Sequence, residues 1–445
     1  MAFTDLYRQK LTSAESAVAA VKSGDWVDFG SMLLMPEILD RALAARKDEL
    51  SNVKIRGLLA YRPLITPSAD PTGKAFSYNS WFMSSIERKL SDQGFCHLIP
   101  MSYRNKPDIY RRYLDIDVAM LQLPPMDNKG YFNFSVANCS TAAMLSKSKK
   151  IIVEVNENLP PVCFGAEGQI HVSEVDMIVE GDHDRLPQVV TGPASETEMK
   201  IAQLIAEQVE DGSNLQIGVG SLPAQIGEIL AGSNLKDLGI HTELIGPSFL
   251  KLAKSGVVTN KRKKLDQGIS VWTLCAGDDE TYDWVRNNPE LNSYPVDYTN
   301  GLHVLAQTDK LITVNNCVEA DLFGQICSES SGTRQISGSG GQLDFLQGSF
   351  LSKGGKSFIC MSSTFFDKRE NRFKSRIVPT LPNGSTVTDP RSVAFYLVTE
   401  WGIANLMGKS LWERAEAIIS IAHPDFRDSL IQDAESLGIW RKSNR

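Results

Sequence analysis

The first residue that could take part in chemistry is a single carboxylate inside an apolar run. Glu243 lies within LGIHTELIG, residues 238–246, and the residues around it have the composition of a strand. A carboxylate that is buried or half-buried raises the energy of the fold unless it is paired or used in chemistry. Most glutamates lie on the surface, so position alone favours an ordinary surface role. Glu243 becomes a candidate only if other functional groups are brought beside it.

A glycine turn precedes Glu243 in the sequence. Residues 218–223 read GVGSLP, follow a strand expected at residues 215–217 and precede an expected helix. Glycine allows a ligand to approach the backbone closely, and the amides at the start of a helix favour an anion such as a phosphate or an oxyanion. An ordinary tight turn is the alternative and is the commoner outcome for one glycine pair. Pro223 occupies the place of the third glycine in a dinucleotide fingerprint, so NAD is a poor match.

A second glycine-rich loop follows Glu243. Residues 337–342 read SGSGGQ and contain Gly338, Gly340 and Gly341. Three glycines in four residues favour close approach of the backbone to a ligand more than an ordinary turn does. A flexible hairpin loop is an equally good interpretation of this segment.

The elements that must position these residues occur twice along the chain. Residues 23–39 and 211–230 both run from glycine through a β-rich stretch to Gly, Ser, Pro and an apolar-periodic helix. Each follows an expected helix with a capping box, from Thr12 to Glu15 and from Ser195 to Glu198. The order of elements predicts a duplicated α/β domain, with a boundary in the Pro- and Gly-containing residues 186–194.

Further apolar runs predict strands that are covered on both faces, as in parallel sheets. They lie at residues 118–123, 150–155, 310–314 and 357–361. The loops that follow parallel strands meet at one edge of a sheet, where ligands bind. Glu243 would then lie beside both glycine loops. A capping box at Ser410 predicts a last long helix that ends near residues 423–424, followed by a basic surface tail at 438–445.

Composition excludes several classes of function. The 445 residues suit two large domains or three small ones, and the net charge of −7 argues against nucleic acid as the main partner. Seven cysteines without CxxC spacing and six histidines without HExxH predict neither a disulfide framework nor a metal site. No secretory leader and no apolar run of about 18 residues is visible, so we expect a cytoplasmic protein outside the membrane.

Two familiar catalytic motifs are also missing. Residues 354–357 read GGKS, but Phe350 stands where a Walker A loop needs its first glycine. The sequence has no GxSxG elbow, which disfavours a lipase-type serine hydrolase.

Taken in order, these motifs resemble class I CoA-transferases of the acetyl-CoA hydrolase/transferase family, particularly the butyryl-CoA:acetate and 4-hydroxybutyrate CoA-transferase branches. The resemblance covers essentially the whole chain. It rests on EVNENLP, HVSEVD, LQIGVGSLP, LGIHTEL, PVDYTN, GQLDFLQG and IAHPDFR, which begin at residues 154, 171, 215, 238, 295, 341 and 421. In this chain Gly-Pro-Ser follows at residues 246–248, where related sequences often carry Ser-Asp-Gly, which puts the local loop shape and the acyl preference in doubt.

The resemblance implies an α/β fold of two tandem, similar NagB/RpiA-like CoA-transferase domains with mainly parallel sheets, spanning residues 1–190 and 191–445. It implies that Glu243 is the nucleophile and that Gln216 lies near the thioester carbonyl. The residues implied to contact coenzyme A are Gly218, Val219, Gly220, Ser221, Leu222, Gly338, Gly340, Gly341, Met361 and Gly384.

The resemblance also implies an activity, the transfer of CoA between a short-chain acyl-CoA and a carboxylate through a glutamyl-CoA thioester. Butyryl-CoA and acetate are the expected pair. Transfer to 4-hydroxybutyrate or propionate, acetyl-CoA hydrolysis and non-catalytic acyl-CoA binding stay open. The family implies coenzyme A thioester as a substrate, no permanently bound cofactor, no metal, and a homodimer or a dimer of dimers.

The repeat partner of GVGSLP provides a candidate acyl pocket. Residues 30–36 read GSMLLMP, and Ser31, Met32 and Met35 are the candidate lining. The flexible methionine side chains could instead fill irregular gaps in the core, and the two interpretations are equally good.

Overall fold

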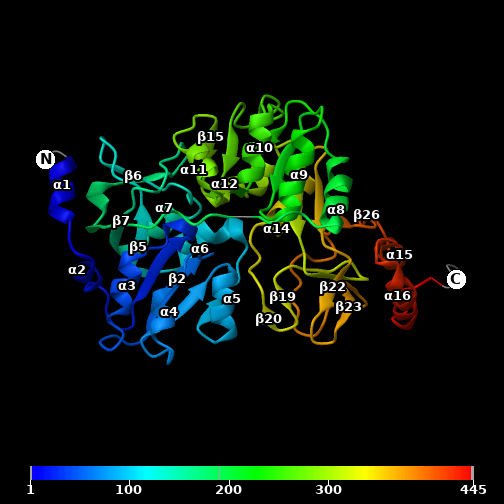
Figure 1. Ribbon diagram of the computed structural model, residues 1–445, viewed down its shortest axis with the longest axis horizontal. Coiled ribbons are helices and arrows are strands. Elements are labelled where there is room, and N and C mark those ends of the chain that lie inside the picture. The colour runs from blue at the N-terminus through cyan, green and yellow to red at the C-terminus, as the bar shows by residue number, and fades with distance from the viewer. Residues whose placement is uncertain (1–2, 190, 442–445) are drawn as a thin grey trace. The chain divides into compact units, whose positions relative to one another are not determined.

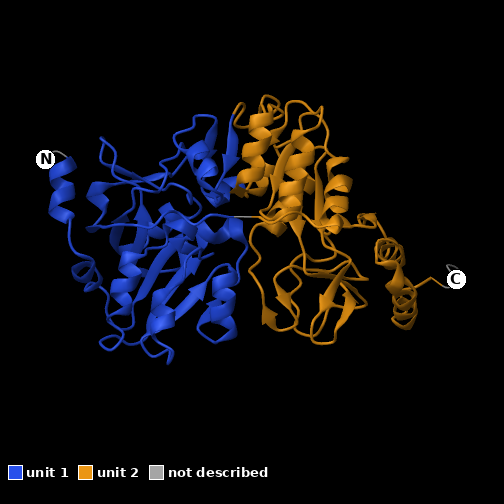
Figure 2. Cartoon of the chain, in the orientation of Figure 1, with its two compact units in different colours: residues 1–190, 269–299 blue, residues 191–268, 300–445 orange. Residues whose placement is uncertain are grey.

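The computed structural model describes residues 3–189 and 191–441. The chain forms two compact units (Figure 2). Unit 1 comprises Met1–Val190 and Ile269–Thr299, and unit 2 comprises Thr191–Gly268 and Asn300–Arg445. The first unit therefore contains the expected 1–190 domain, but residues 269–299 of the expected 191–445 domain group with it.

Main-chain hydrogen bonds attach residues 269–299 to unit 1. The amide of Cys275 donates to the carbonyl of Val136 at 2.8 Å, and the amide of Gly165 donates to the carbonyl of Ser293 at 2.9 Å. An isolated β-bridge also joins Ala137 to Leu274. These pairings give hydrogen-bond partners to backbone groups of the 130–165 region, among them the carbonyl of the buried Val136.

Unit 1 contains a seven-stranded sheet of order β4-β3-β2-β1-β5-β7-β9 (Figure 1). Every neighbouring pair is parallel. The strands are β1 Trp26–Ser31, β2 Val53–Leu58, β3 Phe76–Ser80, β4 Cys96–Leu98, β5 Ile116–Leu123, β7 Ser148–Val155 and β9 Met177–Glu180. Val27, Phe29 and Ile55 of this sheet pack in one core with Leu39 and Leu43 of the following helix.

The helices of unit 1 are short. They are α1 Phe3–Lys10, α2 Ala14–Val18, α3 Ile38–Ala44, α4 Ile65–Ala69, α5 Ser85–Asp92, α6 Lys106–Tyr113, α7 Thr141–Leu145, α11 Asp279–Val285 and α12 Val296–Thr299. Three 3-10 turns and small strands complete the unit: η1 Met32–Leu34, η2 Tyr103–Asn105, η3 Val172–Glu174, β6 Tyr131–Asn133, β8 Gln169–His171, β13 Ser270–Trp272, β14 Leu274–Cys275 and β15 Leu291–Ser293.

Unit 2 contains a six-stranded sheet of order β11-β10-β16-β21-β25-β26, parallel except for the β25–β26 pair. The strands are β10 Asn214–Ile217, β11 Gly239–Ile240, β16 Leu311–Asn316, β21 Lys356–Cys360, β25 Tyr396–Thr399 and β26 Gly402–Asn405. Its helices are α8 Glu196–Ala206, α9 Ser221–Ala231, α10 Pro247–Ser255, α13 Leu302–Leu305, α14 Gln342–Leu351, α15 Leu411–Ser420 and α16 Pro424–Ser436. Two mainly parallel α/β sheets are the predicted fold class, which is confirmed.

Short strands of unit 2 lie outside the main sheet. They are β12 Leu244–Ile245, β17 Glu319–Asp321, β18 Ile326–Cys327, β19 Ser330–Ser331, β20 Arg334–Gln335, β22 Thr364–Asp367, β23 Arg372–Ser375 and β24 Ile377–Val378. The β19–β20 and β22–β23 pairs are antiparallel.

Two of the three predicted capping boxes are confirmed. Ser195 and Ser410 each cap a helix whose third residue, Glu198 or Glu413, bonds back to the cap. The box at Thr12 is wrong, because Ser13 is the cap and accepts from the amide of Ser16.

The predicted end of the last helix is also wrong. Helix α15 ends at Ser420, and the longer α16 begins at Pro424 with His423 as its cap. Proline at the first position of a helix has no amide to satisfy, so it can begin the helix rather than end one. The expected basic tail is described only as far as Arg441.

Three expected absences can be compared with the described part of the chain. Within residues 3–189 and 191–441, no helix combines the length and apolar character that a membrane crossing requires. The same residues include no group of three His, Cys, Asp or Glu side chains that could hold a metal ion. All seven cysteines are free thiols.

Candidate active site

Glu243 lies in a bend between β11 and β12, so the expectation of a strand at this residue was wrong. The main sheet ends early here, because β11 pairs with β10 only through Gly239 and Ile240. His241 and Thr242 are buried, whereas Glu243 itself is half-buried. The chain therefore leaves the sheet after Ile240, and Glu243 lies beyond the end of the strand, where ligands of parallel sheets bind.

An asparagine amide holds the Glu243 carboxylate. The Nδ2 group of Asn300 donates to Oε2 of Glu243 at 2.7 Å and to Oδ2 of Asp344 at 3.3 Å. Both acceptors are carboxylates, so the amide nitrogen must face them and the orientation of Asn300 is fixed. Its other atom, Oδ1, is buried and has no hydrogen-bond partner among the described residues. This oxygen can accept a hydrogen bond from a ligand N–H group.

The second glycine loop touches the same carboxylate. A Cβ atom added at Gly341 would overlap Oε2 of Glu243 and Nδ2 of Asn300. Gly340 has φ +54°, a left-handed conformation that glycine adopts without strain. Only glycine at position 341 lets the backbone lie against the carboxylate, and helix α14 begins at the next residue.

The surroundings raise the pKa of Glu243 to about 8. Burial is the larger cause, the negative charge of Asp344 adds to it, and the hydrogen bond from Asn300 opposes both. Burial disfavours the ionised form because the charge loses water. The carboxylate of Glu243 is therefore poorly solvated and held in one place by Asn300.

The first glycine turn lies next to the segment that follows Glu243. Gly218, Val219 and Gly220 line a small cavity together with residues 246–249. Gly220 has φ +140° and caps α9 without a side-chain bond, so the first amides of that helix remain available to an anion. The Ser221 hydroxyl donates to Glu198 and Leu222 is buried in the core, so only backbone groups of these two residues are offered to a ligand.

Gln216 is buried near the end of β10 and pairs with Asn315 of the neighbouring β16. Nδ2 of Asn315 donates to Oε1 of Gln216 at 3.1 Å, and Nε2 of Gln216 donates back at 3.4 Å. A donor role of Gln216 toward a thioester carbonyl stays a prediction. Its Nε2 group would have to share or give up the 3.4 Å hydrogen bond to Asn315.

The two remaining predicted CoA contacts lie elsewhere in unit 2. Met361 packs in the hydrophobic core with Leu397 and Ile418. Gly384 is exposed and has φ +86°, and a Cβ there would meet the side chain of Thr333 in the β19–β20 turn. The structure brings Glu243 together with Gly341, and the Gly218–Gly220 turn together with the segment after Glu243. The contacts of Met361 and Gly384 are with other parts of the unit.

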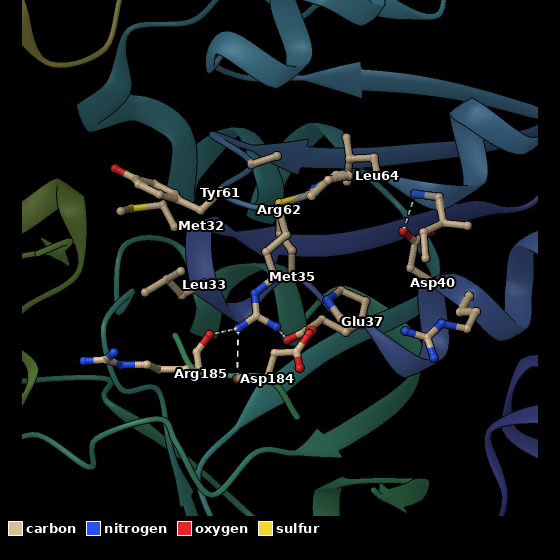
Figure 3. A pocket seen from close by; sticks show the side chains of 15 residues that line it. Met32, Leu33, Met35, Glu37, Asp40, Tyr61, Arg62, Leu64, Asp184 and Arg185 are labelled. Carbon is tan, nitrogen blue, oxygen red and sulfur yellow. Dashed lines mark hydrogen bonds and ion pairs between the residues drawn. The ribbon is translucent and has the colours of Figure 1, made fainter. Parts of the chain in front are cut away.

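The candidate acyl pocket belongs to unit 1 (Figure 3). Met32 and Met35 line a cavity of about 390 Å³ with Leu33, Tyr61 and Leu64 around them. The Arg62 guanidinium crosses this cavity, pairs with Glu37, and donates to the carbonyl groups of residues 184 and 185. Ser31 is buried and is not part of the cavity wall.

Sequence reasoning missed two residues of the Glu243 site. Asn300 lies 57 residues after Glu243 in the sequence, and Asp344 lies 44 residues after Asn300. Both lie within motifs that carry the family resemblance, PVDYTN and GQLDFLQG. The motifs contained the signal, but the contacts that unite them are long-range.

A half-buried carboxylate with a fixed orientation can act as a nucleophile toward a carbonyl, provided that it is ionised when the substrate arrives. The backbone of Gly341 lies against this carboxylate, and the start of helix α9 at Ser221 presents free amides that favour an anion.

Comparisons with known proteins add the family. Residues 2–190 match the acetyl-CoA hydrolase/transferase N-terminal domain, and residues 277–434 match the C-terminal domain. A butyryl-CoA:acetate CoA-transferase from Anaerostipes caccae is 48% identical over 447 residues, which covers 100% of both chains. A 4-hydroxybutyrate coenzyme A transferase from Clostridium kluyveri is 37% identical and covers 97% of this chain and 99% of its own.

Solved structures agree with this relation. RipA from Yersinia pestis has a TM-score of 0.89 and 35% identity, covering 99% of this chain and 100% of that one. A 4-hydroxybutyrate CoA-transferase from Porphyromonas gingivalis has a TM-score of 0.77 and 32% identity, with coverages of 98% and 100%. Matches over both halves of the sequence and over the whole fold lead to one conclusion: this chain belongs to the acetyl-CoA hydrolase/transferase family.

Proposed function

We propose that this protein transfers CoA from butyryl-CoA to acetate, with Glu243 as the covalent nucleophile. One observation carries the proposal: the Glu243 carboxylate lies against the backbone of Gly341, is held by Asn300 and has a pKa raised to about 8. The 48% identity to a butyryl-CoA:acetate CoA-transferase over the full length supports this pair of substrates.

The raised pKa bears directly on nucleophilicity. A carboxylate in water is a weak nucleophile because water stabilises its charge. A desolvated, positioned carboxylate gives up less hydration free energy when it attacks a carbonyl. Asn300 stabilises the ionised form at one oxygen and thereby fixes which oxygen attacks. The same burial that raises the pKa therefore makes the ionised form reactive.

The reaction exchanges one thioester for another. Glu243 attacks the butyryl carbonyl, the C–S bond breaks, and an acyl-glutamyl anhydride and CoA thiolate result. The thiolate then attacks the glutamyl carbonyl, which releases butyrate and leaves glutamyl-CoA. Acetate attacks that thioester, and the displaced thiolate takes the acetyl group, so that acetyl-CoA leaves and Glu243 is regenerated. No proton is gained or lost overall.

Backbone donors would stabilise the oxyanions of these steps. The amides at the start of α9 are available, and the Gln216 amide is the proposed side-chain donor. One donor aimed at a developing oxyanion is typically worth about 3–4 kcal/mol in the transition state. The remote nucleotide of CoA contributes binding free energy that holds the reacting end in place.

Three further features belong to the proposal because the family resemblance implies them. We infer a homodimer or a dimer of dimers in the cytoplasm, which light scattering and cell fractionation would test. Because thioester is exchanged for thioester, the chemistry requires neither a permanently bound cofactor nor a metal. Activity that survives dialysis against a chelator would agree with that.

The deciding experiment traps the covalent intermediate. Protein incubated with butyryl-CoA without an acceptor is reduced with borohydride, digested and analysed by mass spectrometry. We expect a mass-shifted peptide modified at Glu243, and acetyl-CoA formation once acetate is added. Modification at another residue, or transfer without any modification, would refute Glu243 as the nucleophile.

Variants sharpen the test. Glu243→Gln keeps the size and removes the nucleophile, so we expect a folded protein whose transfer rate is at least a thousandfold lower. Glu228→Gln is the matched control, since Glu228 is an exposed glutamate in the same unit that pairs with Lys251. Product analysis with and without acetate separates transfer from hydrolysis, and 4-hydroxybutyryl-, propionyl- and acetyl-CoA define the acyl preference.

A further inference from the structure

Two buried carboxylates of unit 2 hold the second glycine-rich loop, residues 337–342, from behind. The Ser339 hydroxyl donates to Oε2 of Glu329 at 3.2 Å. Nε2 of Gln342, at the end of the loop, donates to Oδ2 of Asp389 at 2.6 Å. Glu329 is 4% exposed and Asp389 is fully buried. The loop is therefore tied to the core of its unit by two side-chain hydrogen bonds.

Gly341 lies between these two hydrogen bonds, one residue from Gln342 and two residues from Ser339. Its backbone lies against Oε2 of Glu243, where an added Cβ atom would overlap that oxygen. No water molecule fits between atoms in such contact, so Gly341 shields one side of the carboxyl group. The position of this shield depends on the residues that hold the loop on each side of it.

Glu329 holds the loop through its backbone as well as its side chain. Its carbonyl accepts from the amides of Ile336 at 2.8 Å and Ser337 at 3.1 Å. The Thr388 hydroxyl donates to Oε1 of the carboxylate at 3.0 Å and fixes its orientation. The carboxylate is thus held in place by the core and holds the loop in turn.

The two carboxylates are costly groups to bury. Every printed donor to them is neutral, and among residues 3–189 and 191–441 neither forms an ion pair. Oδ1 of Asp389 is buried without a hydrogen-bond partner in that part of the chain. Burial raises the pKa of Asp389 to about 7, the hydrogen bond from Gln342 opposes this shift, and the charge of Glu329 adds to it. Apolar packing would stabilise the unit more cheaply, so the carboxylates point to a role beyond stability.

We propose that Glu329 and Asp389 are positioning residues that hold the 337–342 loop against Glu243 and thereby keep water from the glutamyl-CoA thioester. Exclusion of water from a reactive intermediate prevents its hydrolysis. The loop then determines the class of acceptor, because CoA passes to a carboxylate and not to water. This inference rests on the proposed function and deepens it.

Displacement of the loop would open a hydrolytic side reaction. Water attacks the carbonyl carbon of the Glu243 thioester, and the C–S bond breaks. The water oxygen and one proton stay on the Glu243 carboxyl group, and the other proton goes to the CoA sulfur. The products are the free enzyme and CoA thiol, without acetyl-CoA. The ratio of CoA thiol released to acetyl-CoA formed therefore reports how well the loop excludes water.

Measurement of both products tests the proposal. Each protein is incubated with butyryl-CoA and acetate, CoA thiol is measured with a thiol reagent, and acetyl-CoA is measured by chromatography. Ser339→Ala loses the hydrogen bond to Glu329, and Gln342→Met loses those to Asp389 and Ser328. We expect each variant to raise the ratio of thiol to acetyl-CoA at least tenfold, because a hydrogen bond to a buried carboxyl group is lost. Ser339→Thr keeps the hydroxyl and should retain the wild-type ratio.

Variants of the carboxylates extend the test. Glu329→Ala and Asp389→Ala should raise the same ratio. The double variant of Ser339→Ala with Glu329→Ala should be no worse than the more impaired single variant, because both changes remove one hydrogen bond. If the carboxylate variants do not fold, Ser339→Ala and Gln342→Met carry the test alone.

A matched control separates the position of the loop from the stability of helix α14. Ser352 caps the far end of this helix, is buried, and donates through its hydroxyl to the Thr308 carbonyl at 2.6 Å. Ser352→Ala should lower the melting temperature and change the ratio less than twofold. An unchanged ratio in folded Ser339→Ala and Gln342→Met would overturn the proposal, as would an equal rise in Ser352→Ala.

Hydrogen exchange distinguishes failure of this inference from failure of the proposed function, because it requires no substrate. The amides of Ile336 and Ser337 should exchange at least tenfold faster in Ser339→Ala and Gln342→Met than in the wild-type chain, and at the wild-type rate in Ser352→Ala. If no glutamyl-CoA is trapped, the proposed function fails, and exchange still decides whether the carboxylates hold the loop. Unchanged exchange in the first two variants would overturn the anchoring, whatever the trapping experiment shows.

Discussion

At the scale of single residues, neighbouring groups act in opposite directions on the pKa of Glu243. Burial and Asp344 disfavour the ionised carboxylate, and Asn300 favours it. The balance places the pKa at about 8, so the group changes charge within the range in which enzymes are assayed. A pH dependence of activity and of stability follows, with a definite sign for each.

The pH dependence of activity follows from the need for the ionised form. Below pH 8 most Glu243 is protonated and cannot attack, so kcat/KM for butyryl-CoA should rise with pH by up to about tenfold per unit and level off above pH 8. A pH series of initial rates, corrected for spontaneous thioester hydrolysis, measures this. A profile that is flat from pH 6 to pH 9 would contradict the assignment.

The stability effect has the opposite sign. An unfolded chain releases the Glu243 proton near pH 4.5, whereas the folded chain keeps it to about pH 8, so stability falls as pH rises between these values. Glu243→Gln removes this penalty. Its melting temperature should exceed that of the wild-type chain by a few degrees at pH 9 and by less at pH 5, as differential scanning calorimetry would show.

The order of strand, glycine turn, apolar run and second glycine loop predicts that Glu243 lies beside both loops, and the structure places Gly341 against its carboxylate. The role of Glu243 as the nucleophile stays a prediction, and its partners were not assigned from the sequence. Asn300 and Asp344 gained no role, because their pairing with Glu243 spans long stretches of chain that no local pattern reports. Ser31 was expected on the pocket wall, but the structure buries it behind Met32, against Lys106.

At the scale of elements, helix α3 is held by a carboxylate that comes from the sheet. Glu154, near the end of β7, is fully buried and accepts from the amides of residues 37, 38 and 39 at 3.0, 3.2 and 2.9 Å. His183 Nε2 lies 2.8 Å from the same carboxylate. A negative charge at a helix start satisfies free amides and complements the helix dipole. This contact fixes the helix that follows the Met32–Met35 wall.

Replacing this carboxylate should loosen that wall. Glu154→Gln brings an NH₂ group toward amide donors, so we expect a loss of about 3 kcal/mol in the free energy of unfolding. Urea denaturation followed by tryptophan fluorescence would measure it. Glu157→Gln is the control, since Glu157 belongs to the same EVNENLP motif and is exposed. Equal stability of the two variants would show that Glu154 does not hold α3.

The sequence predicted elements well where the pattern was local. Strands β5, β7, β16 and β21 lie at the expected apolar runs, and two serine caps start helices where expected. It failed at Thr12, where the neighbouring Ser13 caps better placed amides, and at Pro424, which begins a helix instead of following one. At both places the local sequence is compatible with two helix boundaries, and the tertiary structure determines which one forms.

At the scale of the whole molecule, the sequence predicted two similar α/β units but not the path of the chain between them. Residues 269–299 look like a continuation of the second half, yet their backbone bonds join them to unit 1. Gly165 illustrates why, since a Cβ there would overlap the Tyr294 ring. The fit depends on a residue more than one hundred positions away, and a single sequence carries no sign of it.

This path makes a prediction about fragments. A fragment of residues 1–190 lacks the strands β13–β15, so the carbonyl of Val136 and the amide of Gly165 lose their partners, and backbone that loses its hydrogen bonds and its covering segment opens more readily. We expect amides in residues 133–166 to exchange hydrogen at least tenfold faster in the fragment than in the full chain, as mass spectrometry would measure. Residues 26–31 of the central strand β1, which pairs only within 1–190, serve as the internal control. Equal protection of residues 133–166 in both proteins would mean that the segment 269–299 adds nothing to the stability of the unit it joins.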